Sequence, residues 1–413
     1  GPVAYLWIVC GCIFAGAVHD YFCGMLSMRH DGAGLPELCG HYLGKTTRSL
    51  MLVFTVLLLI MVGTVFVYSP AEILHTMGGD TMMWVAIIFV YYIIATMLPI
   101  DKIIGKVYPL FAFSLLFMAG ALMIWLFIHW PTIPEVWTHF YNMGAATEPD
   151  KWKDAIFPAL FITIACGAIS GFHGTQSPLM ARCVGNERMG RPIFYGAMIT
   201  EGIVALIWAS VSSWFFYGDP APGYTLIANA TAGFHSSAPA VVNLVCNDWL
   251  GVVGAVLAML GVVAAPITSG DTAFRSGRLI VAEWLKLNQR PIIHRFYICI
   301  PMFAISIAML VWQVENPDGF NTIWQYFGFS NQALSVFTLW TITVYLVRNK
   351  KPYWVTLIPA LFMTTVCSTF FFVSKQTLHL PENVGYPLGI VSLVIAIVWF
   401  CIWYRKETKT INS

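Results

Sequence analysis

Polar side chains and helix-breaking residues interrupt an apolar stretch of the chain at residues 167–178. This segment carries three glycines, a proline and five polar side chains within twelve residues. A helix facing lipid cannot contain it, because each unsatisfied backbone group there costs several kcal/mol. Irregular backbone occurs at membrane depth where it lines a cavity, and broken helices form the binding sites of many transporters. The alternative interpretation is a kink at Pro178, with the glycines serving close helix packing.

A second polar cluster lies at residues 265–272. The sequence places the hydroxyl groups of Thr268, Ser269 and Thr272 beside the carboxylate of Asp271, and such oxygens are suitable ligands for a hard cation. A buried aspartate is also a suitable proton carrier. The alternative interpretation is that Asp271 pairs with Arg275, four residues later on the same helix face.

Further polar groups stand isolated within apolar segments. Asn331 and Gln332 carry amides that either contact a substrate or join neighbouring helices by hydrogen bonds. Asp20, next to His19, and Glu201 are ionisable at membrane depth, where such groups are functional candidates. The alternatives are pairing of His19 and Asp20 with an arginine or a loop, and a protonated Glu201 that bonds to a neighbouring helix.

The elements that position these groups must lie in a membrane. Of the 413 residues, 58% are hydrophobic and only 10% are charged, whereas roughly 25% of the residues of an ordinary soluble domain are charged. The net charge of +2 is too small to indicate nucleic acid as a partner. The ten cysteines lie almost entirely in apolar stretches without metal-ligand spacing, so they are interpreted as packing residues.

Long apolar runs predict eleven membrane-spanning segments. A spanning helix needs about 20 mostly apolar residues, and these runs are continuous instead of alternating with period two, which favours helices. The predicted class is an all-α, multi-pass membrane protein with one transmembrane domain over residues 1–413. The eleven segments are 3–28, 47–69, 82–100, 103–130, 155–178, 192–217, 248–274, 291–314, 321–347, 352–373 and 386–404.

The basic residues assign an orientation to these segments. Cytoplasmic connections carry an excess of Lys and Arg, and 19 of the 22 basic residues fall on one set of segment ends. The opposite set contains only Lys151, Lys153 and Lys375. The first residue is therefore expected outside and Ser413 in the cytoplasm.

Four long blocks of the sequence are more specific than any short motif. They read GPVAYLWIVCGCIFAGAVHDYFCGMLSMRHDGAGLPEL, ISGFHGTQSPLMARCVGNERMGRPIFYGAMITEGIVALIW, APITSGDTAFRSGRLIVAEWL and WQYFGFSNQALSVFTLWTITVYLV. These blocks resemble the carbon starvation protein A (CstA) family, and the likeness extends over essentially all of the chain. The resemblance implies a transporter of the bacterial inner membrane that takes up peptides or, in close relatives, pyruvate with protons. It also implies the five-plus-five inverted-repeat (LeuT-like) fold, in which the first and sixth helices are broken around the substrate.

The resemblance also implies roles for residues. If one helix precedes the visible segments, 155–178 becomes the sixth helix and 248–274 the eighth, where related transporters place hydroxyl ligands for sodium. The expected mechanism is alternating access, with exposed amides and hydroxyls of the broken helix holding a substrate carboxylate. No cofactor is expected beyond a transported H⁺ or Na⁺. The residues expected at the substrate are Ser170, Gly171, His173, Gly174, Thr175, Gln176, Ser177, Asn331 and Gln332, and those expected to couple an ion or proton are Thr268, Ser269, Asp271, Thr272, Asp20 and Glu201.

The resemblance is incomplete at both ends of the chain. Family members carry a Gly/Pro-rich segment ahead of Gly1, expected to form the first helix and half of the site, and longer members continue beyond Ser413. Peptide or pyruvate as substrate, the coupling ion and the oligomeric state are therefore left open. A channel and a nutrient receptor are alternatives. No enzymatic activity is expected, since His173 near Ser177 is the nearest approach to a nucleophile–base pair.

Overall fold

Helices account for nearly all of the regular structure of this chain. The computed structural model describes residues 1–97, 100–143, 156–219, 238–316 and 319–412, which leaves Lys151 and Lys153 outside, and no strand forms in the described ranges. The helices are α1 Val3–Gly11, η1 Cys12–Gly16, α2 Ala17–Arg29, α3 Leu35–Leu43, α4 Lys45–Met77, α5 Thr81–Met97, α6 Ile100–His129, α7 Ala159–Thr163, α8 Gly171–Ala181, η3 Glu187–Met189, η4 Arg191–Tyr195, α9 Gly196–Tyr217, α11 Ala238–Trp284, α12 Ile292–Glu315, α13 Gly319–Arg348, α14 Trp354–Val373 and α15 Glu382–Asn412.

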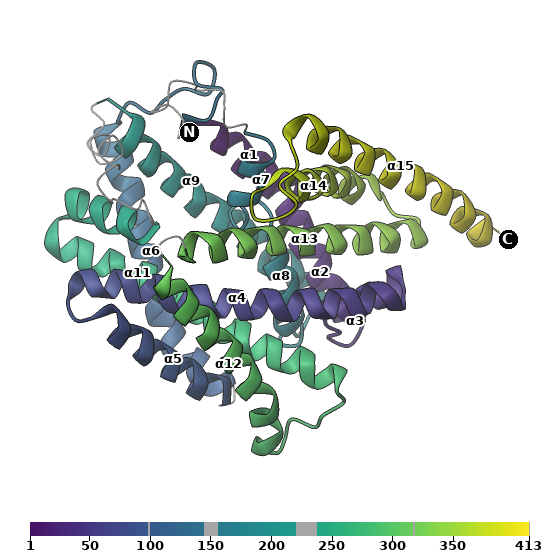
Figure 1. Ribbon diagram of the computed structural model, residues 1–413, viewed down its shortest axis with the longest axis horizontal. Coiled ribbons are helices and arrows are strands. Elements are labelled where there is room, and N and C mark those ends of the chain that lie inside the picture. Colours follow the sequence, from purple (N-terminus) through teal and green to yellow (C-terminus); the bar gives the residue numbers. More distant parts are fainter. Residues whose placement is uncertain (98–99, 144–155, 220–237, 317–318, 413) are drawn as a thin grey trace. The chain divides into compact units, whose positions relative to one another are not determined.

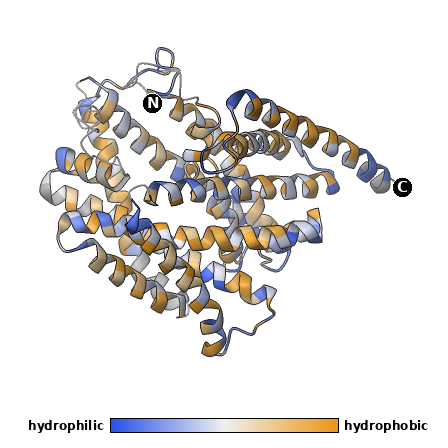
Figure 2. Ribbon diagram, in the orientation of Figure 1, coloured by the Kyte–Doolittle hydropathy of each residue, from blue (hydrophilic) through white to orange (hydrophobic). Residues whose placement is uncertain are grey.

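The eleven predicted segments all lie mainly on helices. Eight helices in the described ranges are long and apolar enough to cross a membrane, and α15 shows the pattern, with hydrophobic colour between two hydrophilic ends (Figure 2). Of the other three segments, α5 has 17 residues, 155–178 is divided between α7 and α8, and α13 is 30 residues long but carries polar residues that lower its hydropathy. The chain is a multi-pass membrane protein.

Two compact units make up the chain. The first unit comprises residues 1–3, 59–154 and 204–320, and the second comprises 4–58, 155–203 and 321–413. Every contact described below lies within one of these units. The single transmembrane domain expected from the sequence stays a prediction.

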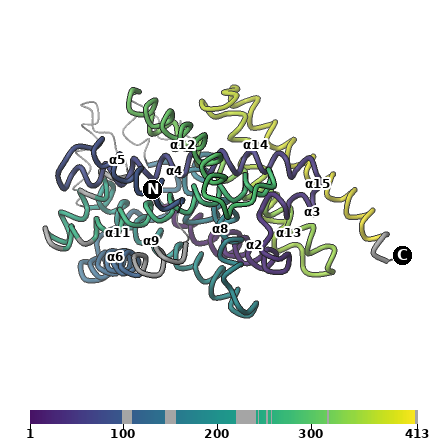
Figure 3. Tube along the Cα trace, turned by 90° about the horizontal axis from the view of Figure 1, so that it is seen from below, coloured from purple at the N-terminus to yellow at the C-terminus, as the bar shows by residue number. Residues whose placement is uncertain are grey.

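In the first unit, α11 packs along α6 and also contacts α5 and α12, and the first two lie side by side in both views (Figures 1 and 3). A Cβ atom at Gly261 would lie 2.6 Å from the carbonyl oxygen of Ser114, so glycine allows this close approach. The indole rings of Trp125 and Trp249 stack with their centroids 3.7 Å apart in the same core.

In the second unit, α2 packs on α8 and on η4, and α14 runs beside α15 (Figure 1). The segments α1, η1 and α2 form one continuous span, Val3–Arg29, with a single π-helical turn at Cys12–Gly16. A second π-helical turn, Arg191–Tyr195, leads into α9. Such turns occur frequently near functional sites, and here each precedes a helix that carries an ionisable side chain.

Candidate functional site

A break is present between α7 and α8 at residues 164–170, and it overlaps only the start of the predicted stretch 167–178, because residues 171–178 are helical and Pro178 lies inside α8. The chain leaves helical geometry at Ile164 (φ −91°, ψ 78°) and enters α8 from the extended residue Ser170 (φ −133°, ψ 118°). Both ends of the interruption leave backbone groups that the helices themselves cannot satisfy. Since lipid offers no hydrogen-bond partner, side chains of the protein must supply them.

Two adjacent amides of α13 supply those partners. The side-chain oxygen of Asn331 accepts the backbone N–H of Phe172 at 2.6 Å and the hydroxyl of Ser170 at 3.2 Å. The side-chain nitrogen of Gln332 donates to the carbonyl oxygen of Phe161 in α7 at 2.8 Å. Asn331 therefore caps the start of α8, and Gln332 satisfies a carbonyl of α7, so both halves of the broken helix are attached to the same turn of α13.

Three other polar side chains of the predicted substrate stretch form hydrogen bonds within α8 in this conformation. The hydroxyl of Thr175 donates to the carbonyl of Phe172 at 2.7 Å, and that of Ser177 donates to the carbonyl of His173 at 2.8 Å. Gln176 donates from its amide to the Thr175 hydroxyl at 2.9 Å. Their contact with a substrate stays a prediction.

The two glycines of this stretch permit close packing. A Cβ atom at Gly171 would overlap the carbonyl oxygen of Asn331, so α8 approaches α13 more closely here than any other residue would permit. A Cβ atom at Gly174 would lie 3.4 Å from His19 and 3.3 Å from Thr338. Gly174 therefore lies between α13 and the ionisable residues of α2.

Three of the predicted residues, from three different helices, form one chain of contacts. The Nδ1 atom of His173 in α8 lies 2.8 Å from Oδ2 of Asp20 in α2. Its Nε2 atom lies 3.1 Å from Oε2 of Glu201 in α9. The sequence singled out all three as ionisable or polar groups at depth, and the structure brings them together around the imidazole of His173.

His19 extends this network by one residue. Its Nδ1 atom lies 2.8 Å from Oδ1 of Asp20, and its buried Nε2 atom has no hydrogen-bond partner in the described part of the chain. Asp20 therefore receives an imidazole on each of its two oxygens. The sequence offered His19 as an ionisable group at membrane depth, but the predicted coupling residues did not include it, although its place next to Asp20 is the signal for this contact.

The contact between His173 and Glu201 requires a proton. An ionised carboxylate only accepts hydrogen bonds, and Asp20 binds the N–H at Nδ1 of His173. A proton must then lie between Nε2 and Glu201, either on the ring or on the carboxyl group, because otherwise a lone pair faces a carboxylate oxygen. Gain or loss of this one proton makes or breaks a link between α8 and α9.

Exposure differs sharply along the network. The side chains of His19 and Asp20 are 0% and 8% exposed, that of His173 is 20% exposed, and that of Glu201 is 39% exposed. Glu201 is therefore the open end, and Asp20 is the buried end. A buried carboxylate is costly unless it is paired, and two imidazoles pair with Asp20.

The predicted coupling residues on α11 belong to a different arrangement in the first unit. Asp271 is fully buried, and its carboxylate oxygens lie 3.0 and 3.3 Å from Nη2 of Arg275. This is the i,i+4 pair that the sequence offered as the alternative to a coupling role. The same Nη2 donates to the carbonyl of Ala95 in α5 at 2.7 Å. The role of Asp271 in coupling stays a prediction.

The hydroxyl groups proposed as cation ligands also bond within α11. Thr268 donates to the carbonyl of Ala265 at 2.8 Å, and Thr272 donates to the carbonyl of Ser269 at 3.0 Å. Over the described residues, no group of three or more His, Cys, Asp or Glu side chains is arranged to hold a metal ion. Binding of Na⁺ by Thr268 and Ser269 remains a prediction.

A helix broken at membrane depth, attached to a partner helix and flanked by ionisable residues, is the architecture of a secondary transporter. The chain matches the family described as Carbon starvation protein CstA over residues 2–78, 68–219 and 222–370. It belongs to this family, as the resemblance in its sequence predicted.

Two of the relatives carry the names of transporters. A Campylobacter jejuni protein named Peptide transporter CstA is 27% identical, over 87% of this chain and 67% of its own length. The Pyruvate/proton symporter BtsT of Escherichia coli is 23% identical, over 92% of this chain and 71% of its own length. An uncharacterized membrane protein of Haemophilus influenzae is 44% identical, over 52% of this chain and 71% of its own length.

The fold is that of a known transporter. A crystal structure of the manganese transporter of Eremococcus coleocola, in a mutant form, matches with a TM-score of 0.58 at 13% identity, covering 98% of this chain and 88% of that one. This match confirms the predicted LeuT-like fold with a broken helix. The names of these two relatives agree with a transport role instead of an enzymatic one.

Proposed function

We propose that this protein is a secondary transporter of the bacterial inner membrane that takes up a small carboxylate by proton-coupled alternating access. The substrate is a peptide or a pyruvate-like acid, in keeping with the names of the relatives. The observation that carries the proposal is the imidazole of His173 held between Asp20 and Glu201, with contacts of 2.8 and 3.1 Å. An imidazole carries a proton on one or on both of its ring nitrogens, which suits a group that gains and loses one proton per cycle.

The location of His173 on α8 links the proton to the substrate. His173 lies two residues after the start of α8, the half-helix whose N-terminus is the proposed substrate end. Protonation ties α8 to α9 through Glu201, and deprotonation removes this tie. Because Glu201 is the more exposed carboxylate, it is the end that exchanges protons with the surroundings, while Asp20 keeps the ring oriented.

The start of α8 is the position proposed for the substrate carboxylate. Helix N-termini bind anions through their unpaired N–H groups and the helix dipole. In this conformation the amide oxygen of Asn331 takes that place on the N–H of Phe172 and the hydroxyl of Ser170. A substrate carboxylate oxygen would replace the oxygen of Asn331 at these donors. Both a peptide and pyruvate present such a group, so this step is common to the two substrates.

Uptake into proteoliposomes tests the proposal. Labelled pyruvate and a labelled dipeptide are supplied separately, each with an imposed pH gradient, an imposed sodium gradient or neither. Accumulation above equilibrium with the pH gradient alone is the expected result. Accumulation with the sodium gradient alone would reject proton coupling and favour Thr268 and Ser269, and flux that never exceeds equilibrium would indicate a channel.

A pair of matched variants tests the proton site itself. Glu201→Gln keeps the size of the side chain but removes its ability to exchange a proton, so accumulation driven by a pH gradient should be lost. Exchange of labelled for unlabelled substrate needs no net proton movement and should persist. Glu37→Gln, an exposed acid on α3 of the same unit, serves as the control and should behave as the unmodified protein. Full accumulation by Glu201→Gln would remove this carboxylate from the mechanism.

A further inference from the structure

A cavity of about 540 Å³ lies in the second unit, on the side of α2 that does not carry Asp20. The residues of α2 that line it include Val18, Phe22, Met25 and Arg29. Their spacing of four, three and four residues places them on one helix face. Asp20 points from the opposite face of the same helix, so this cavity is separate from the ionisable network.

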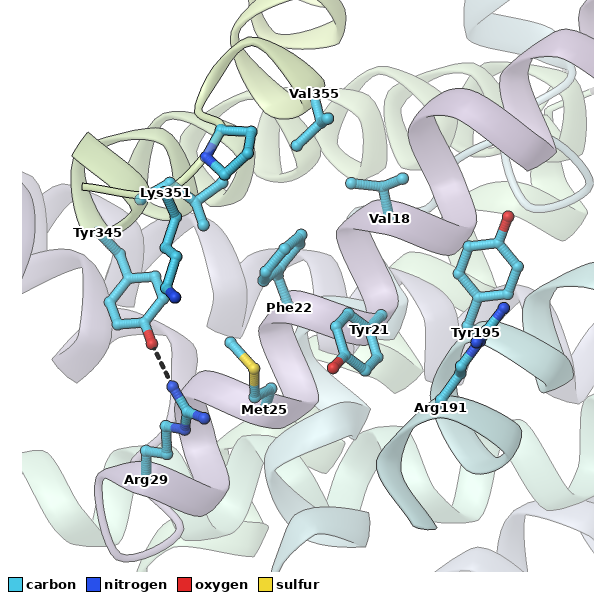
Figure 4. A pocket seen from close by; sticks show the side chains of 12 residues that line it. Val18, Tyr21, Phe22, Met25, Arg29, Arg191, Tyr195, Tyr345, Lys351 and Val355 are labelled. Carbon is cyan, nitrogen blue, oxygen red and sulfur yellow. Dashed lines mark hydrogen bonds between the residues drawn. The ribbon is translucent and has the colours of Figure 1, made fainter. Parts of the chain in front are cut away.

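Three basic side chains line the cavity and no acidic one does. They are Arg29 from α2, Arg191 from η4 and Lys351 from the segment between α13 and α14. Figure 4 shows Arg29, Tyr345 and Lys351 on one side of the cavity and Arg191 on the other, with aromatic and apolar side chains of α2 between them. The distribution of basic residues assigns this end of the unit to the cytoplasmic surface of the membrane.

The carboxylates of the protein do not neutralise all three of these cations. Arg29 donates to the hydroxyl of Tyr345 at 2.6 Å and is also bonded to Glu187, which does not line the cavity. Within the described ranges, no carboxylate lies within ion-pair distance of Arg191 or Lys351. The positive charge of the cavity is thus only partly compensated by the protein.

The remaining wall of the cavity is apolar. Val18 and Phe22 from α2 and Val355 from the start of α14 are half-buried and line it. A soluble anion would gain nothing from this surface. An acyl chain would, because burial of apolar area is favourable by about 25 cal/mol per Å².

We propose that this cavity binds one anionic phospholipid of the cytoplasmic leaflet. Its phosphate is held at Arg29, Tyr345 and Lys351, with Arg191 on the opposite side adding to the positive field, and an acyl chain lies along Val18, Phe22 and Val355. Basic pockets between helices on the cytoplasmic side are suited to anionic headgroups, since each Lys or Arg near such a surface attracts them. The bound lipid contacts the face of α2 that lies opposite Asp20.

Lipid binding to the purified, delipidated protein tests the proposal. Native mass spectrometry measures retention of phosphatidylglycerol and of phosphatidylcholine with matched acyl chains. Phosphatidylglycerol should bind about tenfold more tightly, because only its headgroup has a net negative charge. Equal retention of the two lipids would overturn the proposal.

Two double variants of equal charge locate the binding. Removal of both cations in Arg191→Gln with Lys351→Gln should weaken phosphatidylglycerol binding by about 30-fold. The control is Arg188→Gln with Lys350→Gln, two exposed neighbours that do not line the cavity. An equal loss in the control, or no loss in the first pair, would contradict the assignment.

A third variant separates a lipid from a soluble phosphate. Val355→Trp fills the apolar part of the cavity and leaves every cation in place, so it should reduce phosphatidylglycerol binding by about tenfold or more. Soluble glycerol phosphate at tenfold excess over the lipid should not displace it. Displacement by glycerol phosphate, together with full binding by Val355→Trp, would show a site for a soluble anion and reject the lipid.

Discussion

Two buried acids of this protein have partners with different proton chemistry. Asp271 is paired with Arg275, whose guanidinium keeps its proton under all ordinary conditions. Asp20 is paired with His19 and His173, and an imidazole can gain or lose a proton. The pair of Asp271 and Arg275 is therefore suited to stay intact, whereas the contacts of Asp20 with its two imidazoles are suited to form and break. This difference favours the network of His173 as the proton site over Asp271.

Asp271→Asn should lower stability by about 3–5 kcal/mol, because it leaves the buried guanidinium of Arg275 without its counter-charge. The melting temperature of the purified protein in detergent measures this loss. Asp271→Leu combined with Arg275→Met removes both charges and should recover most of the stability. An unchanged melting temperature with complete loss of proton-driven uptake would instead return Asp271 to the coupling mechanism.

The role of His19 can be separated by two amide substitutions. The side-chain N–H of asparagine reaches the place of Nδ1, which bonds to Asp20 at 2.8 Å, whereas that of glutamine reaches the place of Nε2. His19→Gln should therefore slow proton-driven uptake by about tenfold, the effect of losing one hydrogen bond to a charged group, and His19→Asn should retain most of the rate. Equal rates for the two variants would show that the bond to Asp20 does not matter.

The interruption between α7 and α8 was predicted from the sequence, whereas its contacts with α13 were not. The glycines predicted an interruption within 167–178 because their effect on a helix is local, but Pro178 does not mark it, since the chain is non-helical at 164–170 and α8 continues through Pro178. The attachment of both halves to Asn331 and Gln332 was not predicted, because the partners Phe172 and Phe161 lie more than 150 residues away in the chain. The sequence left two uses open for these amides, contact with a substrate or hydrogen bonds between helices. The structure shows hydrogen bonds between helices, and contact with a substrate stays a prediction.

Gly171→Ala should destabilise the junction of α8 and α13, because the added Cβ would overlap the carbonyl oxygen of Asn331. Backbone cannot move aside as a flexible side chain can, so we expect a cost of about 1–3 kcal/mol, seen as a lower melting temperature and weaker substrate binding. Gly185→Ala in the same unit meets no atom within 4 Å and serves as the matched control. A melting temperature of Gly171→Ala equal to that of the control would show that α8 shifts without cost.

Over the described residues, hydropathy correctly predicted an all-helical membrane protein, because every spanning segment must satisfy its backbone groups within lipid. The LeuT-like fold was predicted by the resemblance to the CstA family and not by hydropathy. The sequence predicted the residues of the ionisable network one by one but did not predict that they contact one another. Asp20, His173 and Glu201 lie on three helices, and only tertiary packing brings each of the two carboxylates within 3.1 Å of the imidazole of His173. The distribution of basic residues predicts the orientation of the chain in the membrane, which can be tested independently of the fold and of the side-chain network.

Fusions of green fluorescent protein test that orientation, since the reporter becomes fluorescent only on the cytoplasmic side. A fusion after Ser413 should be fluorescent, because the end of α15 carries Arg405, Lys406 and Lys409. A fusion after Leu378, between α14 and α15, should be dark. The opposite pattern would invert the assigned topology, and equal signals would show that α15 does not cross the membrane.

The π-helical turns at Cys12–Gly16 and Arg191–Tyr195 give α2 and α9 a means of changing register. A π-turn holds one more residue than an α-turn, and its conversion to α-helix advances the following helix by one residue, a rotation of about 100°. Asp20 follows the first turn by four residues and Glu201 follows the second by six. Either conversion would carry a carboxylate away from His173 without unwinding the helix. Asp20 and Glu201 can therefore be rotated away from His173 independently of each other.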